Sequence, residues 1–142
     1  TVDIPPEEVD EMNTQLKRVG MDNIFLVAPT TPEERTARIA ERASGFIYYV
    51  ALKGVTGAGH LDTNEVMKRV AQIRQHSTLP VAVGFGIKNA ESARSIAKAA
   101  DGVVVGSALV SAMAQANGPG AVLEAAASMI SDIRKGVDSA AS

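Results

Sequence analysis

Residues 80–86 read Pro80-Val81-Ala82-Val83-Gly84-Phe85-Gly86 and contain the pattern that decides the fold. An apolar run without alternating polar residues is typical of a strand in a parallel sheet that is covered on both faces. Glycine follows at once, where the strand must turn into a loop. Similar apolar runs occur at residues 24–27, 46–50 and 102–105, with helical patterns between them. Alternating strands and helices predict an α/β fold with a parallel sheet.

The segments between the apolar runs carry the signals of amphipathic helices. The stretch Thr31-Pro32-Glu33-Glu34 resembles a capping box, with Thr at the N-cap and Pro at the first position, and predicts a helix to about residue 42. Asp62 and Asn89 predict the caps of two further helices. Periodic apolar residues predict helices over about residues 7–18 and 122–133.

Composition excludes several classes of protein. Of the 142 residues 46% are hydrophobic, which is enough for one buried core. With 14 basic and 16 acidic residues the net charge is -2, so nucleic acid or an anionic membrane surface is not an expected partner. The chain has no cysteine and only two, widely separated histidines, so no metal site is predicted. No apolar run approaches the roughly 20 residues of a membrane helix and no signal peptide opens the chain, which favours the cytoplasm.

Glycines gather after three of the predicted strands. They would all lie at the carboxyl ends of parallel strands, the edge at which α/β proteins bind ligands. Glycine lets backbone N–H groups approach an anion, and Ser107 would begin a short helix whose free N–H groups attract phosphate. Each glycine alone is explained by a turn, but together they indicate phosphate binding. The three clusters are Gly54, Gly57 and Gly59, then Gly84 and Gly86, then Gly106 beside Ser107.

Five consecutive motifs resemble the second half of the tryptophan synthase alpha chain family, in order and in spacing. The resemblance implies a (β/α)8 TIM barrel, of which residues 1–142 would form the C-terminal half of a single domain, with the first half absent from this chain. It also implies a lyase of tryptophan biosynthesis that cleaves indole-3-glycerol phosphate to indole and glyceraldehyde 3-phosphate. The motifs are Asp3-Ile4-Pro5-Pro6-Glu7-Glu8, Phe46-Ile47-Tyr48-Tyr49-Val50, Gly54-Val55-Thr56-Gly57-Ala58, Gly84-Phe85-Gly86-Ile87 and Gly106-Ser107-Ala108.

The resemblance assigns expected roles to individual residues around the substrate. Tyr48 would line the site near the reacting indole, and Thr56 would support catalysis from a loop that orders a catalytic aspartate. Phe85 would border the substrate. Backbone N–H groups would hold the substrate phosphate at Gly57, Gly86, Gly106 and Ser107.

The resemblance also implies a partner and a division of the chemistry. Asp3 and Pro5 would face the beta chain of an alpha2-beta2 complex. No cofactor is expected here, because pyridoxal phosphate belongs to the beta chain. The family's two acid/base carboxylates, a Glu and an Asp, match no position in this sequence. These 142 residues alone are therefore expected to be inactive.

Two other functions stay open at this point. Another phosphate-binding TIM-barrel isomerase or synthase would share the glycine clusters, although the loop of residues 54–58 favours the alpha chain. A half barrel without catalytic activity would instead bind a partner, or a second copy of itself, through exposed strand edges and an apolar inner face.

Overall fold

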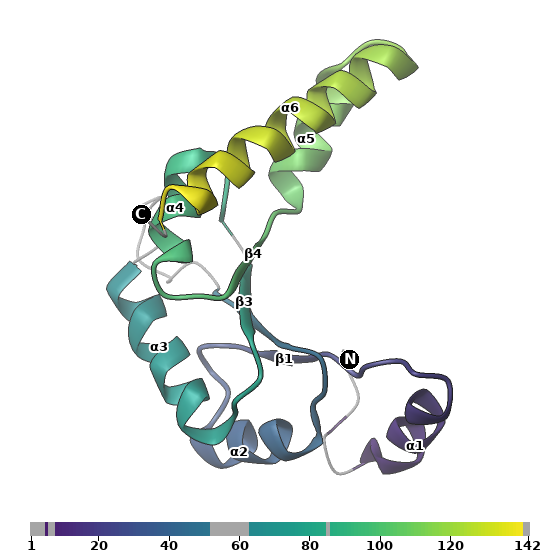
Figure 1. Ribbon diagram of the computed structural model, residues 1–142, viewed down its shortest axis with the longest axis vertical. Coiled ribbons are helices and arrows are strands. Elements are labelled where there is room, and N and C mark those ends of the chain that lie inside the picture. Colours follow the sequence, from purple (N-terminus) through teal and green to yellow (C-terminus); the bar gives the residue numbers. More distant parts are fainter. Residues whose placement is uncertain (1–4, 6–7, 52–62, 85, 141–142) are drawn as a thin grey trace.

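The computed structural model describes residues 5, 8–51, 63–84 and 86–140. Its four strands are parallel and pair in the order β1-β2-β3-β4, which confirms the predicted α/β fold with a parallel sheet. Helices α2, α3 and α4 connect successive strands and lie along one side of the sheet (Figure 1). The strands are β1 (Phe25–Val27), β2 (Ile47–Val50), β3 (Val81–Gly84) and β4 (Gly102–Val104). The helices are α1 (Asp10–Arg18), α2 (Glu33–Arg42), α3 (Thr63–His76), α4 (Ala90–Ala97), α5 (Ser107–Gln115) and α6 (Pro119–Asp138).

The two faces of the sheet differ in their burial. Val27, Tyr49 and Val83 are register partners on the face toward the helices, and all three are buried. Leu26 and Tyr48 are partners on the opposite face and are only half-buried. The alternation of Tyr48 and Tyr49 between the faces agrees with the sequence prediction. The helices contribute buried apolar residues to the same core, namely Ile39, Val66, Val70, Ile73, Ala93, Ile96 and Ile133.

The capping box predicted at Thr31 is wrong. Helix α2 has Pro32 at its N-cap, and no side chain of the described residues caps it. The Thr31 hydroxyl instead accepts a hydrogen bond from the Ala28 N–H at 2.9 Å, and the Thr31 N–H donates to the Ala28 carbonyl at 3.0 Å. The hydroxyl is therefore used to close the turn that precedes the helix.

The cap predicted at Asn89 is confirmed. The Asn89 side chain accepts a hydrogen bond from the Ser92 N–H at 2.9 Å, and the Ser92 hydroxyl accepts one from the Asn89 N–H at 3.2 Å. This reciprocal arrangement fixes the first turn of α4, the helix that follows the glycine-rich loop after β3. The cap predicted at Asp62 lies outside the described residues.

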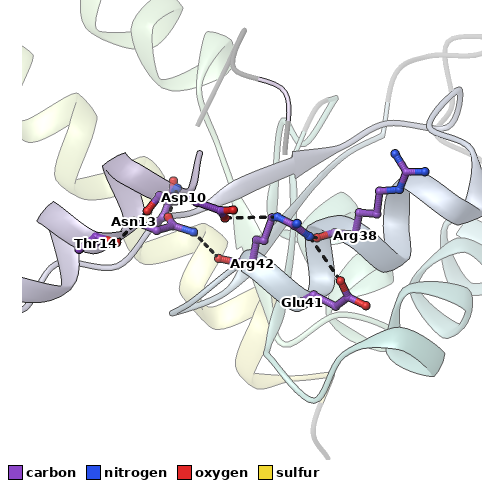
Figure 2. A network of polar contacts seen from close by, with 7 residues as sticks. Asp10, Asn13, Thr14, Arg38, Glu41 and Arg42 are labelled. Atoms are coloured by element: carbon purple, nitrogen blue, oxygen red, sulfur yellow. Dashed lines mark hydrogen bonds and ion pairs between the residues drawn. The ribbon is translucent and has the colours of Figure 1, made fainter. Parts of the chain in front are cut away.

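A network of polar side chains joins α1 to the end of α2 (Figure 2). Asn13 donates a hydrogen bond to the Arg42 carbonyl at 3.1 Å, and Asp10 lies 3.5 Å from the Arg42 Nε. The buried Asn23 donates its amide to the Asn13 side-chain oxygen at 2.6 Å. None of the residues of α1 itself is buried. The helix is therefore held against α2 in part by these polar contacts.

Asp101 links β3 and β4 at the amino-terminal edge of the sheet. Its carboxylate accepts hydrogen bonds from the Val81 N–H at 2.8 Å and from the Arg74 guanidinium at 2.9 Å. Its own N–H donates to the Val81 carbonyl at 2.9 Å. Partial burial acts to raise the pKa of this carboxyl, but the hydrogen bonds from Val81 and Arg74 outweigh burial and hold the pKa below its ordinary value.

We expect Asp101→Asn to lower the free energy of unfolding at pH 7 by about 0.5–1 kcal/mol, a modest loss because water screens this half-exposed ion pair. Because the folded pKa is lowered, the stabilisation is present above the ordinary carboxyl pKa of 3.8 and is lost as the pH falls through the folded pKa. Urea unfolding of the protein and of this variant should therefore show a difference in stability that disappears in acid. Asp132→Asn, which breaks only an exposed pair with Lys135, is the matched control. A difference that is independent of pH would contradict this account.

Candidate functional site

The loops after β3 and β4 leave the sheet side by side. Gly84 pairs with Val104 at the carboxyl ends of the two strands. Gly86 and Gly106 each follow two residues later, so both lie beyond the same edge. Gly86 has a φ of 78°, a backbone conformation that favours glycine. Gly106 has a φ of -119°, and a Cβ at this position would meet open space.

The N-terminus of α5 offers backbone N–H donors that have no acceptor within the helix. Gly106 is the N-cap, and among the described residues no side chain caps the helix. The Val110 N–H donates to the Gly106 carbonyl at 3.1 Å, so the N–H groups of the three preceding residues have no acceptor within the helix. The first turn contains no acidic residue, and Ser107 is exposed. Free N–H groups and the positive end of the helix dipole suit an anion.

The Tyr48 side chain lies over Gly84. Tyr48 on β2 pairs with Ala82 on β3, two residues before Gly84 and on the same face of the sheet. A Cβ built on Gly84 would overlap the Tyr48 hydroxyl and would lie 2.7 Å from the ring Cζ. The ring therefore runs along the sheet toward its carboxyl edge and ends beside the strand that leads to Gly86. The glycine pattern in the sequence did not reveal that Gly84 makes room for this ring.

Several of the predicted site residues lie outside the described residues, namely Asp3, Thr56, Gly57 and Phe85. Of the others, the structure brings together Tyr48, Gly86, Gly106 and Ser107 at one edge of the sheet. Pro5 is described and half-buried, and its carbonyl accepts a hydrogen bond from the Glu8 N–H at 3.0 Å. Its expected contact with a partner stays a prediction.

The described residues show neither a metal centre nor a membrane span. Nowhere in that part of the chain do three His, Asp or Glu side chains come close enough together to hold a metal ion. Likewise, none of the helices described is long and apolar enough to cross a membrane.

Comparison with known proteins identifies the family. Residues 1–138 match the family model described as "Tryptophan synthase alpha chain". The chain belongs to the tryptophan synthase alpha chain family. It is 58% identical over 110 residues to the alpha chain of Chromobacterium violaceum, covering 78% of this chain and 42% of that one. It is 50% identical over 140 residues to the alpha chain of Thiobacillus denitrificans, covering 99% of this chain and 51% of that one.

Solved structures of alpha chains have the same arrangement of strands and helices. The subunit alpha of Legionella pneumophila aligns with a TM-score of 0.78 and 36% identity, over 97% of this chain and 50% of that one. The subunit alpha of Campylobacter jejuni aligns with a TM-score of 0.79 and 34% identity, over 94% of this chain and 52% of that one. The predicted TIM-barrel fold class is thereby confirmed. The chain spans about half the length of the alpha chains that it matches.

We expect Gly84→Ala to lower the free energy of unfolding of a complete alpha chain by about 1–3 kcal/mol, because the added Cβ must displace the Tyr48 ring. In a Tyr48→Ala background, Gly84→Ala should lower the free energy of unfolding by much less, because the ring is no longer there to be displaced. A double-mutant cycle followed by urea unfolding measures this coupling. Gly102→Ala is the matched control in β4, since its Cβ would lie an ordinary 3.7 Å from the Ala82 Cβ. Equal costs with and without the Tyr48 ring would show that ring and glycine do not compete for space.

Proposed function

We propose that this chain supplies the phosphate-binding half of a lyase that cleaves indole-3-glycerol phosphate to indole and glyceraldehyde 3-phosphate. The observation that carries the proposal is the pairing of β3 with β4. It sets Gly86 beside the N-terminus of α5, which no side chain of the described residues caps, at the edge where TIM barrels bind phosphate. Membership of the family supports the alpha-chain reaction over that of another phosphate-binding barrel.

In this proposal the substrate phosphate accepts hydrogen bonds from backbone N–H groups at Gly86, Gly106 and Ser107. Gly57 would contribute from the loop after β2, and Phe85 would border the substrate. Several N–H donors aimed at one dianion give charge-assisted hydrogen bonds, which are about twice as strong as neutral ones. No lysine or arginine is required for such a site, since the helix dipole supplies the positive potential.

Tyr48 would line the other end of the substrate, near the indole, with Thr56 supporting catalysis from the loop after β2. Release of indole needs a proton delivered to the ring carbon, and one removed from a hydroxyl or from the ring nitrogen. The family's Glu and Asp, which match no position here, would perform these transfers from the first half of the barrel. Residues 1–142 would accordingly be the C-terminal half of a single barrel domain.

The same proposal includes the partner and the place of action. Asp3 and Pro5 would face a beta chain in an alpha2-beta2 complex in the cytoplasm. The alpha chain would need no cofactor of its own, and pyridoxal phosphate would be held by the beta chain alone.

The proposal is tested in a complete chain, in which these residues replace the segment of the Thiobacillus denitrificans alpha chain that they match. We expect this chain to release indole, and inorganic phosphate to compete with the substrate. Gly86→Val should raise the KM about 10- to 100-fold, because a branched side chain removes a charge-assisted bond of about 1.5–3 kcal/mol. It should weaken competition by phosphate to the same extent.

Gly118→Val is the control for backbone strain. Gly118 also has a positive φ, of 89°, but a Cβ there would meet open space before α6, away from the proposed site. Gly118→Val should therefore suffer a loss of stability from backbone strain similar to that of Gly86→Val, but it should leave the KM unchanged. An unchanged KM and unchanged phosphate competition in Gly86→Val would remove the phosphate site from the proposal.

A second expectation concerns the 142 residues on their own. Produced alone they should release no indole, because no residue here matches the two acid/base carboxylates. The half-buried sheet face that carries Tyr48 should favour dimers or aggregates. Adding the remaining part of the relative's barrel as a separate polypeptide should restore some activity. Indole release by a monodisperse monomer, measured by light scattering and an indole assay, would refute the proposed division of the chemistry.

A further inference from the structure

Arg69 on α3 reaches across to the start of α2. Its guanidinium donates through Nη2 to the Thr31 carbonyl and, at 3.2 Å, to the Thr36 hydroxyl. Its Nη1 donates to the Gln72 side chain on the same helix at 3.0 Å. One side chain thereby fixes both the residue before the α2 N-cap and a residue in the first turns of that helix.

The contacts of Arg69 continue to the end of β1. Thr31 is joined by two reciprocal hydrogen bonds to Ala28, the residue directly after the last residue of β1. Thr36 is buried, and its hydroxyl donates to the Pro32 carbonyl at 3.1 Å while it accepts from Arg69. The turn of residues 28–32 is thus connected to Arg69 at two points. Arg69 contacts Thr31 directly, and it contacts Pro32 through the hydroxyl of Thr36.

Stability alone does not account for this arginine. Its Nε is buried and has no hydrogen-bond partner among the described residues, which carries a desolvation cost. The charge also lies close to the buried Tyr49. Burial raises the pKa of the Tyr49 hydroxyl, Glu65 raises it further, and Arg69 opposes both. Arg69 as a whole is half-buried, and an apolar side chain of similar length would avoid the cost of burying its unpartnered Nε.

We propose that Arg69 is a positioning residue that holds the turn of residues 28–32 against the indole end of the substrate site. Leu26 on β1 pairs with Tyr48 on β2, so this turn emerges beside the strand of Tyr48. The phosphate loops follow β3 and β4, and neighbouring strands lie about 4.8 Å apart, so β1 is roughly 14 Å from β4. Arg69 therefore acts on the reacting end of the substrate and not on its phosphate. The inference rests on the proposed function.

The test compares two arginines of the same helix in the complete chain. Arg69→Met keeps the alkyl stem and removes the guanidinium. We expect it to lower kcat at least about tenfold, since small displacements in a site slow reactions by such factors, with the KM and the phosphate competition within twofold. Arg74→Met is the matched control, because Arg74 binds Asp101 at the opposite edge of the sheet. It should lower stability and leave kcat unchanged.

Two milder variants keep the test decisive if Arg69→Met does not fold. Thr36→Val removes one acceptor of Arg69 at equal volume, and Arg69→Lys keeps one charged donor without the planar fork. Both should lower kcat less than Arg69→Met, with the KM retained. An unchanged kcat in every variant that folds would overturn the proposal, as would equal losses of kcat in Arg69→Met and Arg74→Met.

Amide hydrogen exchange gives a readout that does not depend on activity. Arg69→Met should accelerate exchange of the Ala28 and Thr31 amides at least about tenfold more than that of Val81, and Arg74→Met should show the reverse order. Equal acceleration at both edges would mean that Arg69 has only a general structural role. If the unmodified complete chain neither releases indole nor binds inorganic phosphate, the proposed function fails, and the exchange pattern still decides whether Arg69 holds the turn.

Discussion

The parallel pairing of β3 with β4 determines where the glycines of the candidate phosphate site lie. Gly84 opposite Val104 sets the register, and the two loops that carry Gly86 and Gly106 follow from it at equal distances. A slip by one residue would separate the loops and turn each β4 side chain to the other face of the sheet. At the amino-terminal edge, Asp101 satisfies the Val81 N–H and gives its own N–H to the Val81 carbonyl, which fixes this register.

The second constraint is the space above β3. A tyrosine ring on β2 can lie along the sheet only if the neighbouring strand offers a position without a side chain, and Gly84 is that position. The ring then extends from the middle of the sheet to its carboxyl edge. Gly84 thus acts through Tyr48, whereas Gly86 acts through its own backbone conformation, although the two glycines are only two residues apart.

Local sequence signals predicted most of the fold. The apolar runs found all four strands to within a residue at each end, because strands of a parallel sheet that is covered on both faces carry continuous apolar sequence. The Asn89 cap was predicted because donor and acceptor are three residues apart. Thr31 was misassigned for a related reason: its hydroxyl can serve either the helix or the preceding turn, and a capping pattern does not distinguish these two uses.

Contacts between distant residues could not be predicted in this way. Gly86 and Gly106 look equivalent in the sequence, yet only Gly86 needs a positive φ, and this depends on how its loop leaves the sheet. The contact of Arg69 with Thr31 joins residues 38 positions apart. No periodicity or motif marks such a pair, since any exposed helix position tolerates an arginine.

The two arginines of α3 show how the ends of the sheet are used differently. Arg74 meets the carboxylate of Asp101 at the amino-terminal edge, where its charge is neutralised and the contact adds to stability. At the carboxyl edge Arg69 donates hydrogen bonds to the Thr31 carbonyl, the Thr36 hydroxyl and the Gln72 side chain, and its Nε is buried without a hydrogen-bond partner in the part of the chain that is described. In TIM barrels the carboxyl edge carries the site and the amino edge contributes stability. Arg69, the arginine that contributes less to stability, lies at the edge where a fixed loop conformation serves binding and chemistry. A role in holding that loop therefore explains the position of Arg69 better than a role in stability does.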